Sequence, residues 1–227
     1  MSEDFKFIEY ARRAVELSIS ELRQSTFIDG RVHSEQGRDI KVEADLFLHK
    51  LISEKLTRDT DIRCLSEEDI LSHGLSDGET VWLLDPLDGS MNFSRGLPLY
   101  CISVALWRNG MPEIGLIYDI ERSREIWSCN GRTYSGHGSV AVSHVQQLDR
   151  AVLATGFPLQ SDLSEKSVKW FLDFASCFKK VRMIGTAALS LAWTAEGRLD
   201  AYFARNIMLW DVAAGLSLVQ GPGTVYF

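Results

Sequence analysis

Residues 81–93 read VWLLDPLDGSMNF, and this stretch governs how the rest of the sequence is interpreted. The apolar run at 81–84 is typical of a buried strand. Pro86 then fixes its own φ and has no amide hydrogen, so we expect the strand to turn there. This turn leaves the side chains of Asp85 and Asp88 free to converge at the carboxyl end of the strand.

The next two residues suit the binding of an anion. Gly89 has no side chain, so the backbone can come close to a ligand there. Ser90 stands where a helix could begin, and the free N–H groups of a helix N-terminus carry partial positive charge that suits a phosphate. On its own, the motif is equally well interpreted as an Asp- and Gly-rich turn capped by a serine.

Other acidic residues favour the functional interpretation. Glu67 and Glu68 follow a strand predicted at 62–65, while Asp45 and Asp211 each open a predicted helix. Taken singly, these residues would be solvated charges or helix N-caps. Four apolar segments that each begin or end with a carboxylate are, however, unusual.

If these carboxylates meet, they require cations. Two unit charges ~4 Å apart repel by about 4 kcal/mol at an effective dielectric constant of ~20. All the candidate ligands are oxygen atoms, so the cation should be hard, with magnesium as the first choice. A carboxylate set holding two such ions beside a phosphate-binding helix end is the equipment for phosphoester hydrolysis.

Composition narrows the class of protein. The chain has 227 residues, is 45% hydrophobic and carries a net charge of −7, which favours a folded protein and argues against a nucleic-acid partner. No signal peptide and no membrane-spanning apolar run are recognisable, so we expect no membrane partner and a cytoplasmic location. The four cysteines form no CxxC pair and are interpreted as reduced thiols: Cys64, Cys101, Cys129 and Cys177.

Periodicity predicts the order of the elements. Residues 3–24 have helical spacing, and 38–56 are predicted to enter a second helix from an extended segment. Asn109-Gly110 and Asn130-Gly131 separate β-rich runs, which is the strongest short signal of a hairpin. From about residue 150, strands alternate with helices, which is typical of an α/β unit.

The predicted fold class is a layered α/β (α+β) protein in two parts. Residues 1–145 form a helix-plus-antiparallel-sheet part with most of the metal ligands, and 146–227 form an α/β part. The site lies between the two parts. The last residues, TVYF at 224–227, resemble the start of a strand, so the second part is expected to be cut short at its end.

The chain resembles the inositol monophosphatase family of magnesium-dependent, lithium-sensitive phosphatases. The resemblance rests on Glu67-Glu68, DPLDGSMNF at 85–93, GTAA at 185–188 and WDVAAG at 210–215, in the right order and at plausible spacing. It implies an αβαβα sandwich, a homodimer, a small phosphorylated substrate and two or three Mg²⁺ ions, with Mn²⁺ as an alternative.

The resemblance also implies a role for each matching residue. The metal ligands would be Glu67, Asp85, the Leu87 carbonyl, Asp88 and Asp211. The amides of Gly89 and Ser90 would bind phosphate oxygens, and the Ser90 hydroxyl, paired with Asp45, would orient the attacking water, with Glu67 as a further catalytic group. The substrate would also contact Asp88, Gly185, Thr186, Ala187 and Asp211.

Two positions depart from the family pattern. Val42 stands where the family usually has a threonine, which removes local support near Asp45. Ala204 stands where inositol-specific members carry a glutamate that accepts hydrogen bonds from ring hydroxyls. We therefore expect a broad phosphatase for sugar and polyol monophosphates, in which Arg205 and Asn206 could face the substrate pocket.

Three alternatives remain open. A 3′(2′),5′-bisphosphate nucleotidase of the family usually shows Lys-Glu-Phe where this chain has Met91-Asn92-Phe93, so the inositol and sugar phosphatase branch is favoured. A fructose-1,6-bisphosphatase of the family is the second alternative. An inactive binding or regulatory homologue is the third, although none of the five metal-ligand positions is lost.

Overall fold

The computed structural model describes residues 3–29, 32–36, 39–67, 75–76, 78–136, 138–157 and 162–220. The helices are α1 (Glu3–Gln24), α2 (Glu43–Thr60), α3 (Ser90–Ser94), α4 (Glu165–Ala175), α5 (Ala187–Ala195) and α6 (Leu209–Gln220), with short 3-10 turns η1 (Thr26–Asp29) and η3 (Leu148–Arg150). The strands are β1 (Val32–Gln36), β2 (Asp39–Val42), β3 (Cys64–Ser66), β4 (Thr80–Asp88), β5 (Cys101–Arg108), β6 (Met111–Asp119), β7 (Arg124–Cys129), β8 (Arg132–Ser135), β9 (Gly138–Ser139), β10 (Val152–Thr155), β11 (Lys180–Arg182) and β12 (Ala201–Phe203).

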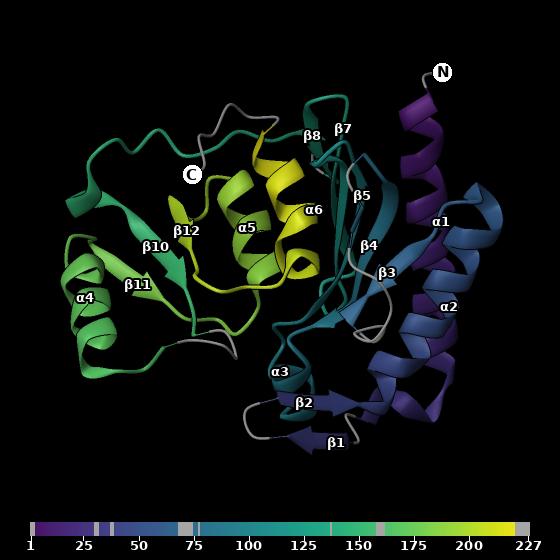
Figure 1. Cartoon of the computed structure of the whole chain (residues 1–227), viewed down its shortest axis with the longest axis horizontal. Helices are drawn as coiled ribbons and strands as arrows, with labels where there is room; N and C mark the ends of the chain where they lie inside the picture. Colours follow the sequence, from purple (N-terminus) through teal and green to yellow (C-terminus); the bar gives the residue numbers. More distant parts are fainter. Residues whose placement is uncertain are drawn as a thin grey trace.

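These elements form five layers, which confirms the predicted αβαβα arrangement (Figure 1). A seven-stranded sheet in the order β3 to β9 has α1 and α2 on one face and α5 and α6 on the other. A three-stranded parallel sheet, in the order β11-β10-β12, lies beyond α5 and α6, and α4 covers its far side. Residues 221–227, with the strand expected at 224–227, lie outside the described part of the chain, as does Glu68.

The core is built on both faces of the seven-stranded sheet. Along β4, Trp82 and Leu84 face α1 and α2, while Val81 and Leu83 face α5 and α6. Both faces of the sheet are therefore buried from solvent. This explains why the sequence of β4 is a continuous apolar run and does not alternate between apolar and polar residues.

The predicted hairpins are confirmed. Asn109 and Gly110 join β5 to β6 with φ of 52° and 79°, and Asn130 and Gly131 join β7 to β8 with φ of 53° and 66°. Positive φ at both central residues is the type I′ geometry that matches the twist of the flanking strands.

The prediction that the strand turns at Pro86 is wrong. β4 continues to Asp88, but its pairing with β5 shifts: Asp85 lies opposite Ser103, and Asp88 lies opposite Cys101. One extra residue on β4 therefore makes a bulge, and such a bulge accommodates a proline without losing the strand. The direction of the Asp85 and Asp88 side chains is therefore set by the bulge and not by the end of the strand.

Small residues bring α6 close to the seven-stranded sheet. A Cβ on Gly115 of β6 would lie 2.4 Å from the Ala214 carbonyl oxygen, and a Cβ on Gly215 would lie 2.4 Å from the Leu191 Cβ of α5. Only glycine permits this approach. The close packing fixes the position of α6, whose third residue is Asp211.

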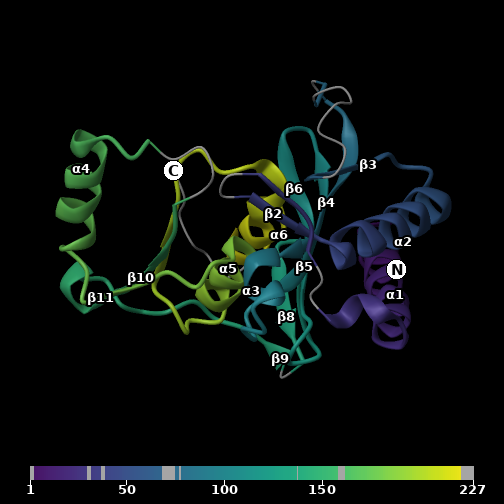
Figure 2. The same cartoon turned by 90° about the horizontal axis from the view of Figure 1, so that it is seen from below.

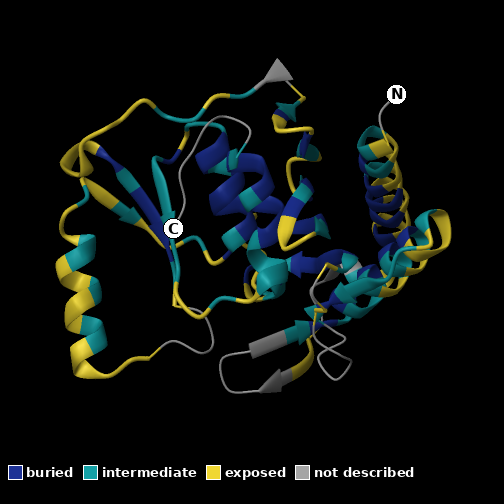
Figure 3. Cartoon of the chain, turned by 45° about the horizontal axis from the view of Figure 1, so that its top comes forward, coloured by how far each residue is buried: buried dark blue, intermediate teal, exposed yellow. Residues whose placement is uncertain are grey.

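The three-stranded sheet is packed more thinly than the large one. In Figure 3, α4 is coloured as exposed or intermediate along its whole length, and no described residue of α4 is buried. Among the residues that the structure describes, no helix is long and apolar enough to cross a membrane.

Candidate active site

Asp85 is the centre of the carboxylate group. Its side chain is 3% exposed, and one of its oxygens accepts a hydrogen bond from the Leu87 amide at 3.0 Å. Burial raises the pKa of Asp85 well above its usual range, and the charges of Asp88, Glu67, Asp211 and Asp45 raise it further. The structure therefore brings five of the six predicted carboxylates into one electrostatic group, and the sixth, Glu68, lies outside the described residues.

Asp88 points toward the N-terminus of α5. Its Oδ2 accepts hydrogen bonds from the Thr186 hydroxyl at 2.5 Å and from the Ala188 amide at 2.6 Å. Burial raises the pKa of Asp88 to about 6, although the bonds from Thr186 and the Ala187 and Ala188 amides act in the opposite direction. An anion at a helix N-terminus is favourable because the first amides have no partner within the helix.

Asp45 joins the first turn of α2 to the start of α3. Its Oδ2 accepts a hydrogen bond from the Val42 amide at 2.6 Å, and its Oδ1 lies 2.9 Å from the Ser90 hydroxyl. The same hydroxyl lies 2.9 Å from the Leu87 carbonyl oxygen, so it can donate to either acceptor. The predicted Asp45–Ser90 pair is present, and the Leu87 carbonyl faces the same point.

Asp211 occupies the equivalent place on α6. Asp45 and Asp211 are each the third residue of their helix, and each accepts a hydrogen bond from the backbone amide three residues earlier, that of Val42 or Met208. Both therefore support the helix start from inside the first turn and are not the N-caps that the alternative interpretation assumed. Burial and the charge of Asp88 raise the pKa of Asp211 to about 7.

Glu67 comes directly after β3, at the same edge of the sheet. β3 runs parallel to β4, so both strands deliver their following residues at one end. The side chain of Glu67 is partly buried, and its charge contributes to the raised pKa values of Asp85 and Asp88.

The glycine at the start of α3 cannot be replaced without strain. Gly89 has φ of 101°, and a Cβ there would lie 2.8 Å from the Leu99 carbonyl oxygen. α3 begins at Ser90, as predicted, so the amides that follow Gly89 have no partner within the helix.

Asn92 connects three segments around this glycine. Its side-chain amide donates to the carbonyl oxygens of Leu99 at 2.7 Å and of Ile184 at 2.8 Å. It also packs against Gly185, whose φ is 77° and whose added Cβ would lie 3.0 Å from Nδ2. The view from below places α3 beside α5 accordingly (Figure 2).

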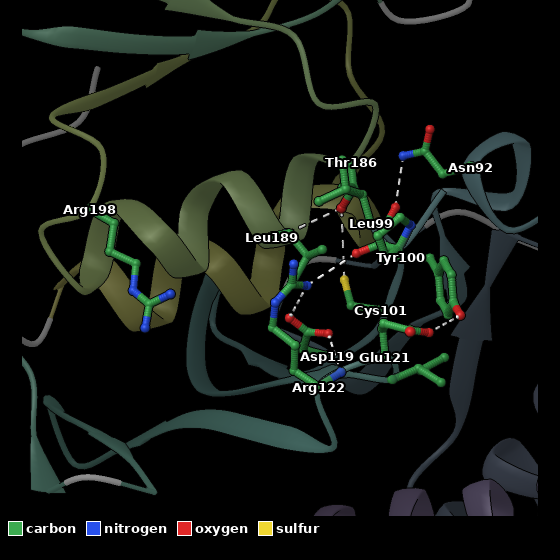
Figure 4. Close-up of polar contacts among 12 residues, drawn as sticks. Asn92, Leu99, Tyr100, Cys101, Asp119, Glu121, Arg122, Thr186, Leu189 and Arg198 are labelled. Carbon is green, nitrogen blue, oxygen red and sulfur yellow. Dashed lines mark hydrogen bonds and ion pairs between the residues drawn. The ribbon is translucent and has the colours of Figure 1, made fainter. Parts of the chain in front are cut away.

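A second set of contacts supports the far side of the site (Figure 4). Cys101 is fully buried, and its Sγ lies 3.8 Å from the Thr186 hydroxyl and 4.0 Å from Asp88 Oδ2. Nearby, Arg122 pairs with Asp119 at 3.0 Å, and the Tyr100 hydroxyl donates to Glu121 at 2.8 Å. These pairs fix the loops that flank the aspartates and take no part in the carboxylate group.

Several residues of the site were not predicted. The amide of Ala188 binds Asp88, the thiol of Cys101 lies beside it, and the charges of Asp88 and Asp211 act with burial to raise the pKa of Tyr202. Asn92 stood inside the quoted motif without an assigned role. The strand predicted around Tyr202 was the only sequence signal that could have placed this tyrosine near the site. No sequence signal singled out Cys101.

The donor set fits a hard cation, although no complete site is preformed. Within the described ranges, no three His, Cys, Asp or Glu side chains converge as a ready metal site. The Asp88 carboxylate is hydrogen-bonded to the start of α5, and the Asp45 carboxylate is hydrogen-bonded to Val42 and Ser90. Buried carboxylates with raised pKa values need positive charge when ionised, and oxygen ligands favour Mg²⁺.

Comparison with known proteins agrees with this geometry. Residues 3–227 match the inositol monophosphatase family. A Nus factor SuhB of Xylella fastidiosa is 35% identical over 82% of this chain and 67% of its own length, and an inositol-1-monophosphatase of Caulobacter vibrioides is 31% identical over 95% and 85%. The chain spans about 60% of the length of some other curated relatives.

The fold comparison points the same way. The structure of an inositol monophosphatase from Anabaena has a TM-score of 0.82 and 27% identity, covering 98% of this chain and 83% of that one. A match of this extent in both sequence and fold shows the family. The chain belongs to the inositol monophosphatase family.

Proposed function

We propose that this chain is a magnesium-dependent phosphomonoester hydrolase that acts on inositol 1-phosphate and related sugar or polyol monophosphates. The single observation behind the proposal is the Ser90–Asp45 pair, with Ser90 Oγ 2.9 Å from Asp45 Oδ1, beside three aspartates of raised pKa: the buried Asp85 and the partly buried Asp88 and Asp211. Such an arrangement combines a group that can orient a water with ligands for the charge that a phosphate brings.

Each residue has a defined task in this proposal. Asp85, Asp88, Asp211, Glu67 and the Leu87 carbonyl would hold the metal ions, and bound Mg²⁺ would supply electrophilic stabilisation of the phosphate oxygens. The Ser90 hydroxyl accepts a hydrogen bond from the attacking water while it donates to Asp45, which keeps the water in line with phosphorus. The amides of Gly89 and Ser90 bind phosphate oxygens.

The attack is direct, without a phosphoenzyme. Ser90 is not a nucleophile in this proposal, because among the described residues its hydroxyl bonds to a carboxylate and a carbonyl and to no histidine or lysine base. The Thr186 and Ala187 segment, with Gly185, borders the phosphate side of the site. Its hydroxyl and amides contact Asp88, so a substrate that approaches α5 also contacts that carboxylate.

The experiment is phosphate release from inositol 1-phosphate and glycerol 2-phosphate with and without magnesium. We expect release that requires Mg²⁺, is abolished by a chelator, and is inhibited by lithium acting at the position of Asp88 and Asp211. Activity unchanged by chelation would overturn the assignment. Size-exclusion chromatography of the same sample tests the homodimer that the family implies.

The names of the relatives provide a second candidate. The Xylella relative is named a Nus factor and not a phosphatase, which favours a protein that acts through binding. A full panel that includes a 3′,5′-bisphosphate nucleotide and fructose 1,6-bisphosphate separates the possibilities. Release from one of these two alone would identify the nucleotidase or the bisphosphatase, and no release from any substrate would favour the binding protein.

A further inference from the structure

Asn92 is a buried polar residue to which the proposed mechanism assigns no task. It lies on α3, two residues after Ser90, and is only 8% exposed. Its side-chain nitrogen Nδ2 lies 2.7 Å from the Leu99 carbonyl oxygen (Figure 4) and 2.8 Å from the Ile184 carbonyl oxygen. A buried amide is costly unless its donors are paired, and here both hydrogens have an acceptor.

The first acceptor lies beside the glycine that precedes α3. The Leu99 carbonyl oxygen is the atom that a Cβ on Gly89 would approach to 2.8 Å. The chain between α3 and β5 returns to this place, and the Leu97 amide donates to the backbone carbonyl of Asn92 at 2.9 Å. Asn92 therefore holds this loop through both its backbone and its side chain, and with it the carbonyl that borders Gly89.

The second acceptor lies just before α5. Ile184 precedes Gly185, whose φ is 77° and on which an added Cβ would lie 3.0 Å from Asn92 Nδ2. Thr186 follows as the N-cap of α5, and its hydroxyl oxygen accepts a hydrogen bond from the Leu189 amide at 3.2 Å. The bond to Ile184 therefore ties the start of α5 to a residue 92 positions earlier in the chain.

These two segments are the ones that the proposed function assigns to the phosphate group. Its oxygens would bind the amides of Gly89 and Ser90 on one side and lie beside residues 185–187 on the other. Asp88 also links β4 to α5, but it is assigned to a metal ion, so its contacts depend on what is bound. Asn92 carries no charge, and its two bonds do not need a cation.

The chemistry of the contact favours asparagine. Both partners are carbonyl oxygens, so the contact needs a nitrogen that carries two hydrogens. Aspartate has the same shape but only acceptor atoms when ionised, and its charge would face two carbonyl oxygens at close range. Serine offers one donor on a shorter side chain. Glutamine is longer by a methylene, in a place where the backbone of Gly185 leaves little space.

We propose that Asn92 is a positioning residue that sets the spacing between the two backbone segments on either side of the phosphate group. It acts through the Leu99 and Ile184 carbonyls and does not touch the substrate, because both of its amide hydrogens are committed. The inference rests on the proposed phosphatase activity and deepens it. Loss of Asn92 weakens phosphate binding and slows turnover, whereas Mg²⁺ affinity changes little, because Asp85 and Glu67 stand on β4 and after β3.

Kinetics of Asn92→Ala with inositol 1-phosphate test this inference. A misplacement of ~1 Å can slow an enzyme about a hundredfold, and an unpaired buried group can change an equilibrium by about tenfold. We therefore expect kcat to fall at least about tenfold and the inhibition constant of inorganic phosphate to rise about tenfold. The magnesium concentration for half-maximal activity should change by less than about twofold, since groups that share no partner act nearly independently.

Two further substitutions complete the series. Asn92→Ser keeps one donor, so its kcat should lie between those of the wild type and Asn92→Ala, and it carries the test if the alanine variant does not fold. Asn92→Asp should be the slowest, because it loses both donors and adds a negative charge near the phosphate group.

Thr133→Val is the matched control. Thr133 is 5% exposed, and its hydroxyl donates to the Leu218 carbonyl oxygen of α6 at 2.6 Å. Valine removes this buried bond, which also joins distant segments, with little change of shape. The free energy of unfolding should fall, while kcat and the inhibition constant of phosphate stay unchanged. A general loss of stability is thereby distinguished from a loss of positioning.

Amide hydrogen exchange provides a measurement without turnover. Exchange reports local opening of the backbone, and it is followed at residues 185–188 in the metal-free protein. Asn92→Ser should speed exchange in this segment about tenfold, because the bond that ties it to α3 is weakened. Thr133→Val should leave the segment at the wild-type rate.

The outcomes separate the two proposals. Phosphate release by the wild type, with unchanged kcat and phosphate inhibition in the Asn92 variants, would overturn the positioning role and leave the phosphatase intact. Faster exchange at 185–188 in Asn92→Ser, without phosphate release from any ester by the wild type, would overturn the phosphatase and retain the link that Asn92 makes. An equal loss of kcat in Thr133→Val, or an equal loss of Mg²⁺ affinity in Asn92→Ala, would reduce Asn92 to a general structural residue and overturn the inference.

Discussion

The two sheets of the molecule are packed in different ways. In the seven-stranded sheet, Leu84 and Leu106 are fully buried, and helices cover both faces. In the three-stranded sheet, every residue of β12 is only partly buried, and Leu172 of the covering helix α4 is 59% exposed. Figure 3 shows α4 coloured as exposed or intermediate along its length. The protein is therefore densely packed around the seven-stranded sheet, which we call the dense side, and thinly packed around the three-stranded sheet, which we call the thin side.

This difference in packing parallels a division between metal binding and recognition of the alcohol. The carboxylates that we assign to metal binding stand on β4, directly after β3 and on α6, all in the densely packed part around the seven-stranded sheet. Ala204, at the position that we connect with recognition of the alcohol, follows β12 in the thinly packed part. Groups that must hold charges in place need rigid support, whereas groups that fit an alcohol can differ between relatives at small cost in stability.

Replacement of Asp85 by asparagine should have the largest effect on the dense side. We expect kcat/KM to fall at least about a thousandfold, because a central ligand loses its charge and electrophilic stabilisation of several kcal/mol is lost. The metal-free variant should nevertheless be more stable. Because the folded-state pKa of Asp85 is raised, its ionised form destabilises the fold at neutral pH, and asparagine removes that charge.

Asp119→Asn is the matched control for this prediction. Asp119 is another buried aspartate, 5% exposed, but its carboxylate pairs with Arg122. Its replacement should lower the free energy of unfolding and leave kcat/KM near the wild-type value. Near-normal turnover of Asp85→Asn at saturating magnesium would remove Asp85 from the site.

The second prediction concerns the pair that orients the water. Ser90→Ala and Asp45→Asn should each lower kcat about a hundredfold or more with a smaller change in KM, since a positioned partner of the reacting proton typically contributes ~10²–10⁴-fold. Kinetics of the double variant check this assignment. If it is no slower than either single variant, the two residues act as one unit. A fully active Asp45→Asn would show that Asp45 only supports the start of α2.

The sequence predicted local structure well and long-range orientation poorly. Asn109-Gly110 needs only its own backbone to make a type I′ turn, so the hairpin was predictable. The direction of Asp88 depends on Thr186, which is 98 residues away, and on the start of α5. The bulge at Pro86 likewise depends on the partner strand, and the local rule that proline ends a strand was therefore misleading.

The functional residues divide in the same way. The five carboxylates could be listed because each stands at the end of an apolar segment, and the structure brings them together around Asp85. The pocket lined by Phe157, Trp170 and Phe203 could not be predicted, because these residues lie after β10, on α4 and on β12. Arg205 and Asn206 both line this pocket, and the expectation that they face the substrate stays a prediction.

The third prediction tests the difference in packing directly. Leu106→Ala, in a fully buried position of β5, should lower the free energy of unfolding by about 2–5 kcal/mol. Leu172→Ala on the exposed side of α4 should change it by no more than about 0.5 kcal/mol. Chemical denaturation of both variants gives the comparison. Equal losses would mean that α4 is covered in solution and that the contrast between the sheets is smaller than we infer.

The last prediction concerns Ala204, at the end of β12 between Phe203 and Arg205 on the thin side. An alanine side chain cannot accept a hydrogen bond from a ring hydroxyl, so one source of preference for inositol is missing. Ala204→Glu should raise the ratio of kcat/KM for inositol 1-phosphate over glycerol 2-phosphate by about tenfold, since a hydrogen bond to a charged group contributes ~1.5–3 kcal/mol.

Ala204→Gln has a similar shape without the charge, and it shows whether the charged acceptor is needed. Both variants should leave the free energy of unfolding almost unchanged, because Ala204 is partly exposed and lies where the packing is thin. A wild-type ratio already in the thousands, or a ratio that Ala204→Glu does not alter, would place inositol specificity on the dense side of the molecule. The division of tasks between the two sheets would then be wrong for this substrate, because the same rigid elements would select the alcohol and hold the charges.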